Sequence, residues 1–156
     1  MDSVKQNQAV IVMDFKMKFE MKYYREKTSK FNGKKGLSWH GCMIYSRYTE
    51  QEKQEQEGLL PFKINYIDHI SSGDTKQDWK AVLSYFEACL LQIKKELPHV
   101  DELYLDTDNA KCYKNPELIL LLNIIAKHHG FKIITFIHTG VQDGKSALDG
   151  YFVKGI

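Results

Sequence analysis

Three aspartates in this sequence occupy positions where strands are predicted to end or a helix to begin. Asp14 directly follows an apolar run, Asp108 lies in an Asp-Thr-Asp-Asn stretch, and Asp149 lies near the start of a predicted last helix. In an open α/β sheet, strand ends and helix starts meet along one edge, where side chains from distant parts of the chain share a crevice. We therefore expect these carboxylates to converge.

Converging carboxylates indicate a particular chemistry. Close carboxylates repel one another unless a cation neutralises them, and Mg²⁺ or Mn²⁺ with oxygen ligands suits such a group. Two ions held by Asp14, Asp108 and Asp149 would activate a water or a 3′-hydroxyl, hold the scissile phosphate and stabilise the leaving oxygen. The predicted chemistry is metal-dependent cleavage or joining of phosphodiester bonds.

Each acid also has an explanation that involves no chemistry. Asp14 could merely end a strand, although an unpaired carboxylate inside an apolar hairpin is costly. Asp108 lies in a composition typical of turns. Asp149 could be the carboxylate of a helix-capping box. Asp106 and Asp143 are alternative ligands, and the sequence does not rank them.

The first half of the chain must position Asp14. Alternating apolar residues predict three antiparallel strands, the first two joined by a turn at Asn32 and Gly33, over residues 9–19, 37–48 and 61–70. A short Gln/Glu/Lys tract between the second and third strands is too polar to pack. A capping box at Thr75 and Asp78 then predicts a helix, and apolar residues recur at helical spacing up to Leu97.

The second half must position the other two acids. A short strand at residues 103–105 precedes Asp108, and Asn115 with Pro116 begins an apolar helix that Gly130 closes. A fifth strand over residues 131–137 and a last helix from Ser146 to the chain end complete the pattern. The order strand-strand-strand-helix-strand-helix-strand-helix predicts an α/β fold with a mixed five-stranded sheet and helices packed on it.

Length and composition are those of one ordinary globular domain. The 156 residues, 43% hydrophobic and 27% charged, predict a single domain over residues 1–156, with the last helix cut short by the chain end. Three cysteines without close pairing indicate a reduced, intracellular protein. No segment is long and apolar enough for a signal peptide or membrane span, and a net charge of +2 does not by itself indicate nucleic acid.

Six segments of the chain together resemble an uncharacterised eukaryotic family derived from transposable elements. They are MDFKMKF at 13–19, YREK at 24–27, GKKGLSWH at 33–40, DWKAVL at 78–83, DNAKCY at 108–113 and GKSALDG at 144–150. The resemblance covers nearly the whole chain. It implies a ribonuclease H-like core similar to that of transposases and integrases with a DDE or DDD triad.

By that resemblance, Asp14 and Asp108 are paired metal ligands and Asp149 is the third acid, on the last helix. The implied cofactor is Mg²⁺ or Mn²⁺, as two ions, and the implied partner is nucleic acid, DNA first, with a nuclear location. The implied function is a metal-dependent polynucleotidyl transferase or nuclease. The alternative is a catalytically inactive, transposase-derived module that binds nucleic acid or protein.

Basic residues near the first hairpin turn are candidates for contacts with a phosphate backbone, with aromatic side chains stacking on bases. An ordinary solvated loop would have the same composition. A further lysine lies in the loop before the last helix. The predicted nucleic-acid contacts are Lys22, Arg25, Lys34, Lys35 and Lys145.

Two rival sites are weaker. Residues 140–146, GVQDGKS, suggest a phosphate loop, but the spacing fails by one residue and no further strand follows. A zinc site lacks the paired spacing of structural zinc motifs, apart from His40-x-Cys42 and adjacent His128 and His129. We expect core and surface roles for the candidates, which are His40, Cys42, Cys112, His128, His129 and His138.

Overall fold

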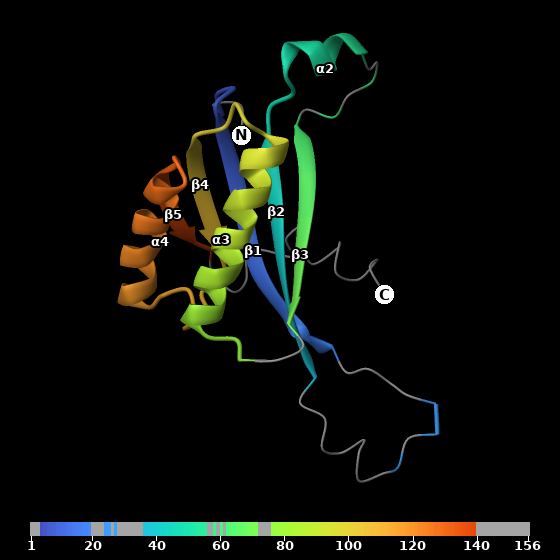
Figure 1. Ribbon diagram of the computed structural model, residues 1–156, viewed down its shortest axis with the longest axis vertical. Helices are drawn as coiled ribbons and strands as arrows, with labels where there is room; N and C mark the ends of the chain where they lie inside the picture. The colour runs from blue at the N-terminus through green and yellow to red at the C-terminus, as the bar shows by residue number, and fades with distance from the viewer. Residues whose placement is uncertain are drawn as a thin grey trace.

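A mixed five-stranded sheet forms the centre of the protein. The computed structural model describes residues 4–19, 24–25, 27, 36–55, 58, 60, 62–71 and 76–139. The elements within them are β1 (Gln8–Phe19), β2 (Leu37–Ser46), α2 (Glu50–Glu55), β3 (Lys63–Ser71), α3 (Trp79–Glu96), β4 (Glu102–Thr107), α4 (Pro116–His128) and β5 (Lys132–His138) (Figure 1). The α/β class predicted from the sequence is confirmed.

The strand order β3-β2-β1-β4-β5 places β1 at the middle of the sheet. Strand β2 pairs antiparallel with both β1 and β3, whereas β4 runs parallel to both β1 and β5. Each parallel strand is reached through a helix, α3 before β4 and α4 before β5. The predicted mixed sheet, with its parallel part made by crossovers, is therefore confirmed.

Helices α3 and α4 lie side by side against one face of this sheet (Figure 1). The apolar stripe predicted on α3 is buried, with Phe86 and Leu90 fully enclosed, and Cys89 joins it. The facing sheet residues include Ile11 of β1 and Leu105 of β4, also fully buried. None of the helices in the described part of the chain has the length and apolar character needed to cross a membrane.

The helix starts follow from local capping. Asp78 caps α3 by accepting the backbone N–H groups of Lys80 and Ala81, each at 3.0 Å. The sequence predicted the cap at Thr75, but the observed cap is Asp78, whose carboxylate itself accepts the free donors of the first turn. Thr75 lies outside the described residues. The predicted start of α4 is confirmed, since the Asn115 side chain accepts the backbone N–H of the residue three positions later at 3.1 Å.

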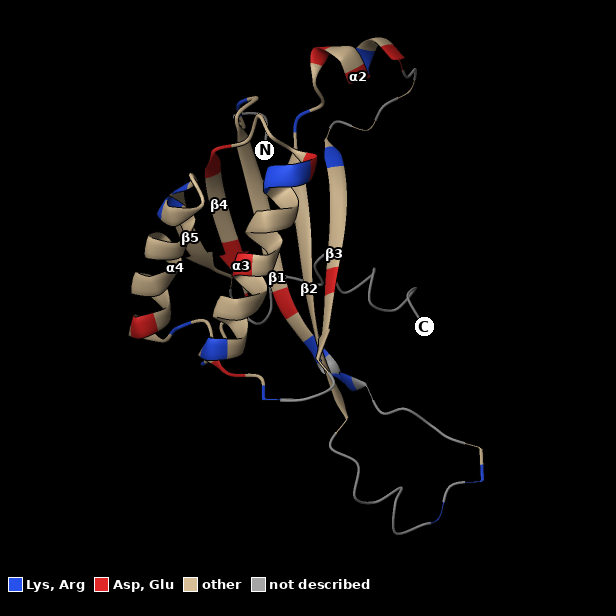
Figure 2. Cartoon of the chain, in the orientation of Figure 1, with Lys and Arg blue, Asp and Glu red and all other residues tan. Residues whose placement is uncertain are grey.

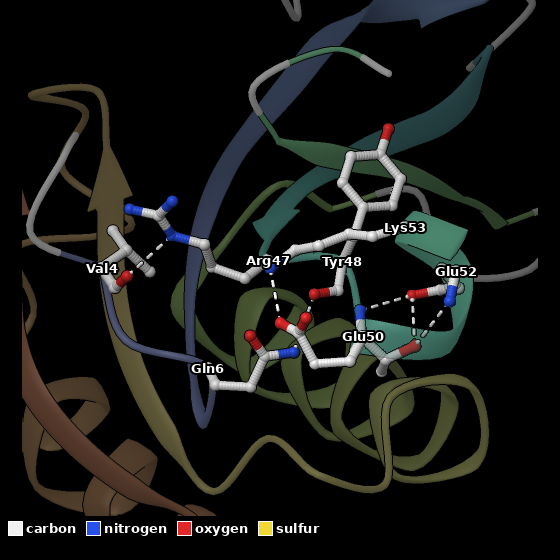
Figure 3. A network of polar contacts seen from close by, with 8 residues as sticks. Val4, Gln6, Arg47, Tyr48, Glu50, Glu52 and Lys53 are labelled. Atoms are coloured by element: carbon white, nitrogen blue, oxygen red, sulfur yellow. Dashed lines mark hydrogen bonds and ion pairs between the residues drawn. The ribbon is translucent and has the colours of Figure 1, made fainter. Parts of the chain in front are cut away.

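The chain ahead of α2 fastens the N-terminal segment to the sheet (Figure 3). The Nε atom of Arg47 donates to the carbonyl of Val4 at 3.0 Å, and the Nε2 atom of Gln6 donates to the carbonyl of Tyr48 at 2.9 Å. Helix α2 itself buries no residue, as its polar composition predicted. These contacts hold the start of β1 beside the end of β2.

Helix α2 forms because a capping box compensates for its lack of apolar contacts. The backbone N–H of Thr49 donates to the Glu52 carboxylate at 2.8 Å, and the Glu52 N–H donates to the Thr49 hydroxyl at 3.3 Å. Lys63 of β3 adds an ion pair to Glu52 at 2.5 Å. The Lys63 ammonium and the Thr49 N–H lower the pKa of Glu52 to about 2.

The turn predicted at Asn32 and Gly33 and the helix predicted from Ser146 lie outside the described residues. The closure of α4 at Gly130 is confirmed. Gly130 has a φ of +85°, a left-handed conformation that suits glycine after a helix end. The short return to β5 that follows sets the position of the last described strand.

Candidate functional site

The register between β1 and β4 brings Asp14 and Asp108 to neighbouring positions. Parallel pairing of these strands ends at Met13 and Thr107, and each aspartate is the next residue along its own chain. Figure 2 shows acidic segments on these adjacent strands. The predicted convergence of these two acids therefore has a direct structural basis.

The strand predicted over residues 9–19 is confirmed, and Asp14 lies inside it, so the alternative in which Asp14 merely ends a strand is wrong. Asp14 pairs with Gly41 of β2, and β1 continues to Phe19. The strand continues because β2 still supplies a hydrogen-bonding partner beyond the point where β4 stops. Strand β4 stops at Thr107, since Asp108 turns the chain by accepting the Ala110 N–H on its own carboxylate at 2.9 Å.

Both aspartates line one pocket of about 320 Å³ at this edge of the sheet. Its walls come from β1, from the segment before α3 and from the loop after β4. The segment before α3 is held in place by Gln77, whose Nε2 atom donates to the carbonyl of Lys16 at 3.0 Å. The other lining residues are Phe15, Gln77, Ala110, Lys111, Cys112 and Tyr113.

The charges of both carboxylates shift the pKa values of two titratable groups on the pocket wall. Burial raises the pKa of the Cys112 thiol to about 11, and the charge of Asp108 and, more weakly, that of Asp14 add to the shift. Burial also raises the pKa of Tyr113, with Asp14 as the next cause. The thiol and the phenol are therefore neutral at ordinary pH, and the negative charge of the pocket comes from the two aspartates. Such a pocket favours a cation.

Tyr113 is fully buried, and its hydroxyl has no hydrogen-bond partner in the described part of the chain. A buried hydroxyl without a partner is uncommon in folded proteins. Sequence reasoning gave no role to Lys111 or Tyr113 and considered Cys112 only as a zinc candidate, although all three lie within five residues of the predicted acid Asp108. Gln77 carried no comparable signal, because only the fold brings it to the pocket.

The alternative ligand Asp106 lies elsewhere. It lines a separate pocket with Val10 and Tyr104, and its Oδ1 atom accepts the Thr139 hydroxyl at 3.3 Å. Burial raises the pKa of Asp106. These partners separate Asp106 from the pocket that holds Asp108.

Most of the remaining predicted site residues lie outside the described residues: Lys22, Lys34, Lys35, Asp143, Lys145 and Asp149. Arg25 is described. Its side chain is exposed, its φ is +58°, and its guanidinium lies 5.3 Å from the ring centroid of Tyr24. An exposed guanidinium beside an aromatic ring is compatible with either of the two roles considered for this hairpin.

A second cluster of potential ligands lies beneath α3. Among the described residues, one group of at least three His, Cys, Asp or Glu side chains is close enough to share an ion, namely His40, Cys42 and His69, with ligand atoms within 4.8 Å of one another. The sequence drew attention to the first two through their spacing. It missed His69, which the register of β2 and β3 places opposite His40.

The other candidates for a zinc site have separate contacts. His129 pairs with Glu87 at 2.9 Å, and His138 contacts the Thr107 hydroxyl at 2.9 Å. His128 is exposed on α4, and Cys112 lines the aspartate pocket. The surface and core roles expected from the sequence describe these four residues.

Comparison with known families places the chain in one of them. The family described as a domain of unknown function (DUF8701) matches residues 1–152. The chain belongs to this family. The match includes both aspartates of the pocket and the cluster beneath α3. No curated protein and no solved structure matches the chain. The family description assigns no activity. The aspartate pocket and the cluster beneath α3 are the two candidate sites in the described part of the chain.

Proposed function

We propose that this member of the family is a divalent-metal-dependent polynucleotidyl transferase or nuclease with a ribonuclease H-like core, acting on DNA phosphodiesters. The observation that carries the proposal is the placement of Asp14 and Asp108 on adjacent parallel strands, at one register level and in one pocket. The strand order supports the fold assignment, because a meander followed by parallel crossovers brings these two strand positions together.

The donor set fits Mg²⁺ or Mn²⁺. Both ions prefer hard oxygen ligands, and the two carboxylates supply them. Burial raises the pKa of the nearby Cys112 thiol to about 11, and the hard ions Mg²⁺ and Mn²⁺ prefer the carboxylate oxygens to its sulfur. When bound, two such ions would supply Lewis-acid activation of a nucleophile and stabilisation of the leaving oxygen.

Each protein group has a defined part in this proposal. Asp14 and Asp108 bind and orient the ions, and we propose Asp149 as the third carboxylate. Lys111 is exposed and lines the same pocket, where its ammonium can meet a phosphate oxygen. The proposed contacts with the rest of the DNA backbone are Lys22, Arg25, Lys34, Lys35 and Lys145.

Manganese binding tests this assignment before any activity is sought. The full chain is titrated with Mn²⁺, and the free ion is measured by its electron paramagnetic resonance signal. We expect the wild type to bind Mn²⁺, and Asp14→Asn and Asp108→Asn each to weaken this binding by at least about tenfold. A tenfold change corresponds to about 1.4 kcal/mol, a modest value for one lost charged ligand. Asp101→Asn is the matched control, because Asp101 is exposed and immediately precedes the opposite end of β4.

Cleavage of labelled DNA with Mg²⁺ or Mn²⁺ then tests the chemistry. The proposal fails if Mn²⁺ binds equally well to Asp14→Asn and the wild type. If DNA binds in a salt-dependent manner but no metal-dependent cleavage or joining occurs, the chain is the alternative, an inactive nucleic-acid-binding module.

A further inference from the structure

The cluster beneath α3 is made by three strand residues on one face of the sheet. His40 of β2 and His69 of β3 are cross-strand partners, and Cys42 follows His40 by two residues, which returns its side chain to the same face. Tyr85 of α3 stacks on both imidazoles, with ring centroids 5.1 Å from His40 and 5.2 Å from His69. The cluster is therefore enclosed between the meander and α3.

Nitrogen atoms in this cluster lack the partners that buried polar atoms normally have. His40 is 0% exposed, and neither its Nε2 atom nor the Nδ1 atom of His69 has a hydrogen-bond partner among the described residues. A buried polar atom without a partner is destabilising and requires an explanation. A bound ion provides one for the Nδ1 atom of His69. His40 faces Cys42 through its Nδ1 atom, so the ion would be bound there and not at Nε2.

The spacing of the atoms suits a tetrahedral ion. With Zn–N bonds of about 2.05 Å and Zn–S bonds of about 2.3 Å, tetrahedral ligand atoms lie roughly 3.4–3.8 Å apart. The His40 Nδ1 and Cys42 Sγ atoms are 3.8 Å apart, and all three ligand atoms fall within 4.8 Å. The largest separation must close by about 1 Å, a distance within the reach of side-chain torsions. The cluster is nearly preformed.

We propose that His40, Cys42 and His69 bind a zinc ion that joins β2 and β3. The three side chains supply three of its ligands, and a water completes the tetrahedron. Imidazole and thiolate donors select zinc over Mg²⁺, so this site is chemically distinct from the aspartate pocket. The ion clamps the edge strand β3, which has one neighbouring strand in the sheet, to β2.

Protonation and access are compatible with this site. Burial lowers the pKa of His40 to about 3, so its imidazole is neutral and can coordinate an ion at ordinary pH. His69 is partly exposed on the edge strand, which provides an entry path for the ion. The neighbouring Cys89 thiol and burial raise the pKa of Cys42, so zinc must displace the Cys42 proton when it binds.

Cobalt spectroscopy tests the site directly. We expect the full chain, freed of metal with a chelator, to bind one equivalent of Co²⁺ with a thiolate-to-cobalt absorption band, and Zn²⁺ to displace it. Cys42→Ser should abolish the band. His69→Gln should weaken zinc affinity by more than about 100-fold, the upper range for losing a residue that only orients a ligand. Cys112→Ser and His128→Gln, a thiol and an imidazole outside the cluster, should change neither result.

The unfolding midpoint of each variant in chelator shows whether it folds. If Cys42→Ser does not fold, the test rests on two other results: the zinc affinity of His69→Gln, a change on the partly exposed strand, and the thiolate band of the wild type. A wild-type cobalt complex without a thiolate band overturns the proposal, as does a band that persists in Cys42→Ser and disappears in Cys112→Ser. Asp14→Asn should retain the zinc site, so failure of the aspartate pocket as a magnesium site would leave this result unaffected.

Discussion

The thiol of Cys112 should act as a chemical reporter of the aspartate pocket. Cys42 and Cys89 are fully buried, whereas Cys112 is partly exposed, so a thiol reagent added to the folded protein should reach Cys112 first. Its pKa of about 11 is raised first by burial and then by the charges of Asp108 and Asp14. Removing either charge should make the thiol more acidic and more reactive.

The size of the effect can be worked out. With a pKa of about 11, the thiolate fraction at pH 8 is about one in a thousand. Burial is the largest cause, so the charge that Asp108→Asn removes carries a smaller part; an interaction of about 0.7 kcal/mol, within the range for partly exposed charges, gives about a threefold rise in thiolate. Intrinsic nucleophilicity falls as the pKa falls, with a Brønsted slope of about 0.4–0.5, so the rate should rise by about twofold.

The rate of Cys112 alkylation is measured with iodoacetamide at pH 8, by quenching the reaction at set times and identifying the modified cysteine by mass spectrometry. Asp108→Asn should react about twofold faster than the wild type, and Asp101→Asn should match the wild type. Saturating Mn²⁺ should accelerate the wild type and have little effect on an Asp14→Asn, Asp108→Asn double variant. An unchanged or slower rate in Asp108→Asn would refute the account of the pocket's electrostatics.

Three further predictions concern stability, each measured by urea denaturation. Phe86→Ala should destabilise the fold by about 3–5 kcal/mol, because Phe86 is fully buried between α3 and the sheet. Asp78→Ala should cost about 0.5–2 kcal/mol by leaving the first N–H groups of α3 without an acceptor, whereas Asp78→Asn should retain most of the stability. Glu52→Gln should cost about 1 kcal/mol at pH 7, a value kept small because the pair with Lys63 is partly solvated. The folded pKa of Glu52, about 2, lies below the ordinary value of 4.5, so its contribution is present above pH 4.5 and is lost as the pH falls toward 2. An equal loss of stability for Glu52→Gln at pH 7 and pH 2 would contradict the role given to the Glu52 charge. A Phe86→Ala variant within about 1 kcal/mol of the wild type would contradict the placement of Phe86 in the core.

The sequence by itself determined the strands, the two packed helices and their order, because these depend on neighbouring residues, whereas helix α2 was not predicted. The helical spacing of apolar residues between Trp79 and Leu97 predicts α3, and the Asn115 cap predicts the start of α4. Alternation predicts the strands. The capping of α3 was placed incorrectly, since Thr75 and Asp78 are both good caps and only the folded chain distinguishes them.

The tertiary structure decided which side chains meet, because strand register links residues that are far apart in the sequence. Register placed Asp14 beside Asp108 inside a continuing strand and set Asp106 apart from them. The assignment of Asp149 as the third acid stays a prediction. Register also placed His69 opposite His40, a contact with no local signal in the sequence. A shift of one residue would send these side chains to the opposite face, so both sites depend on pairing across the whole sheet.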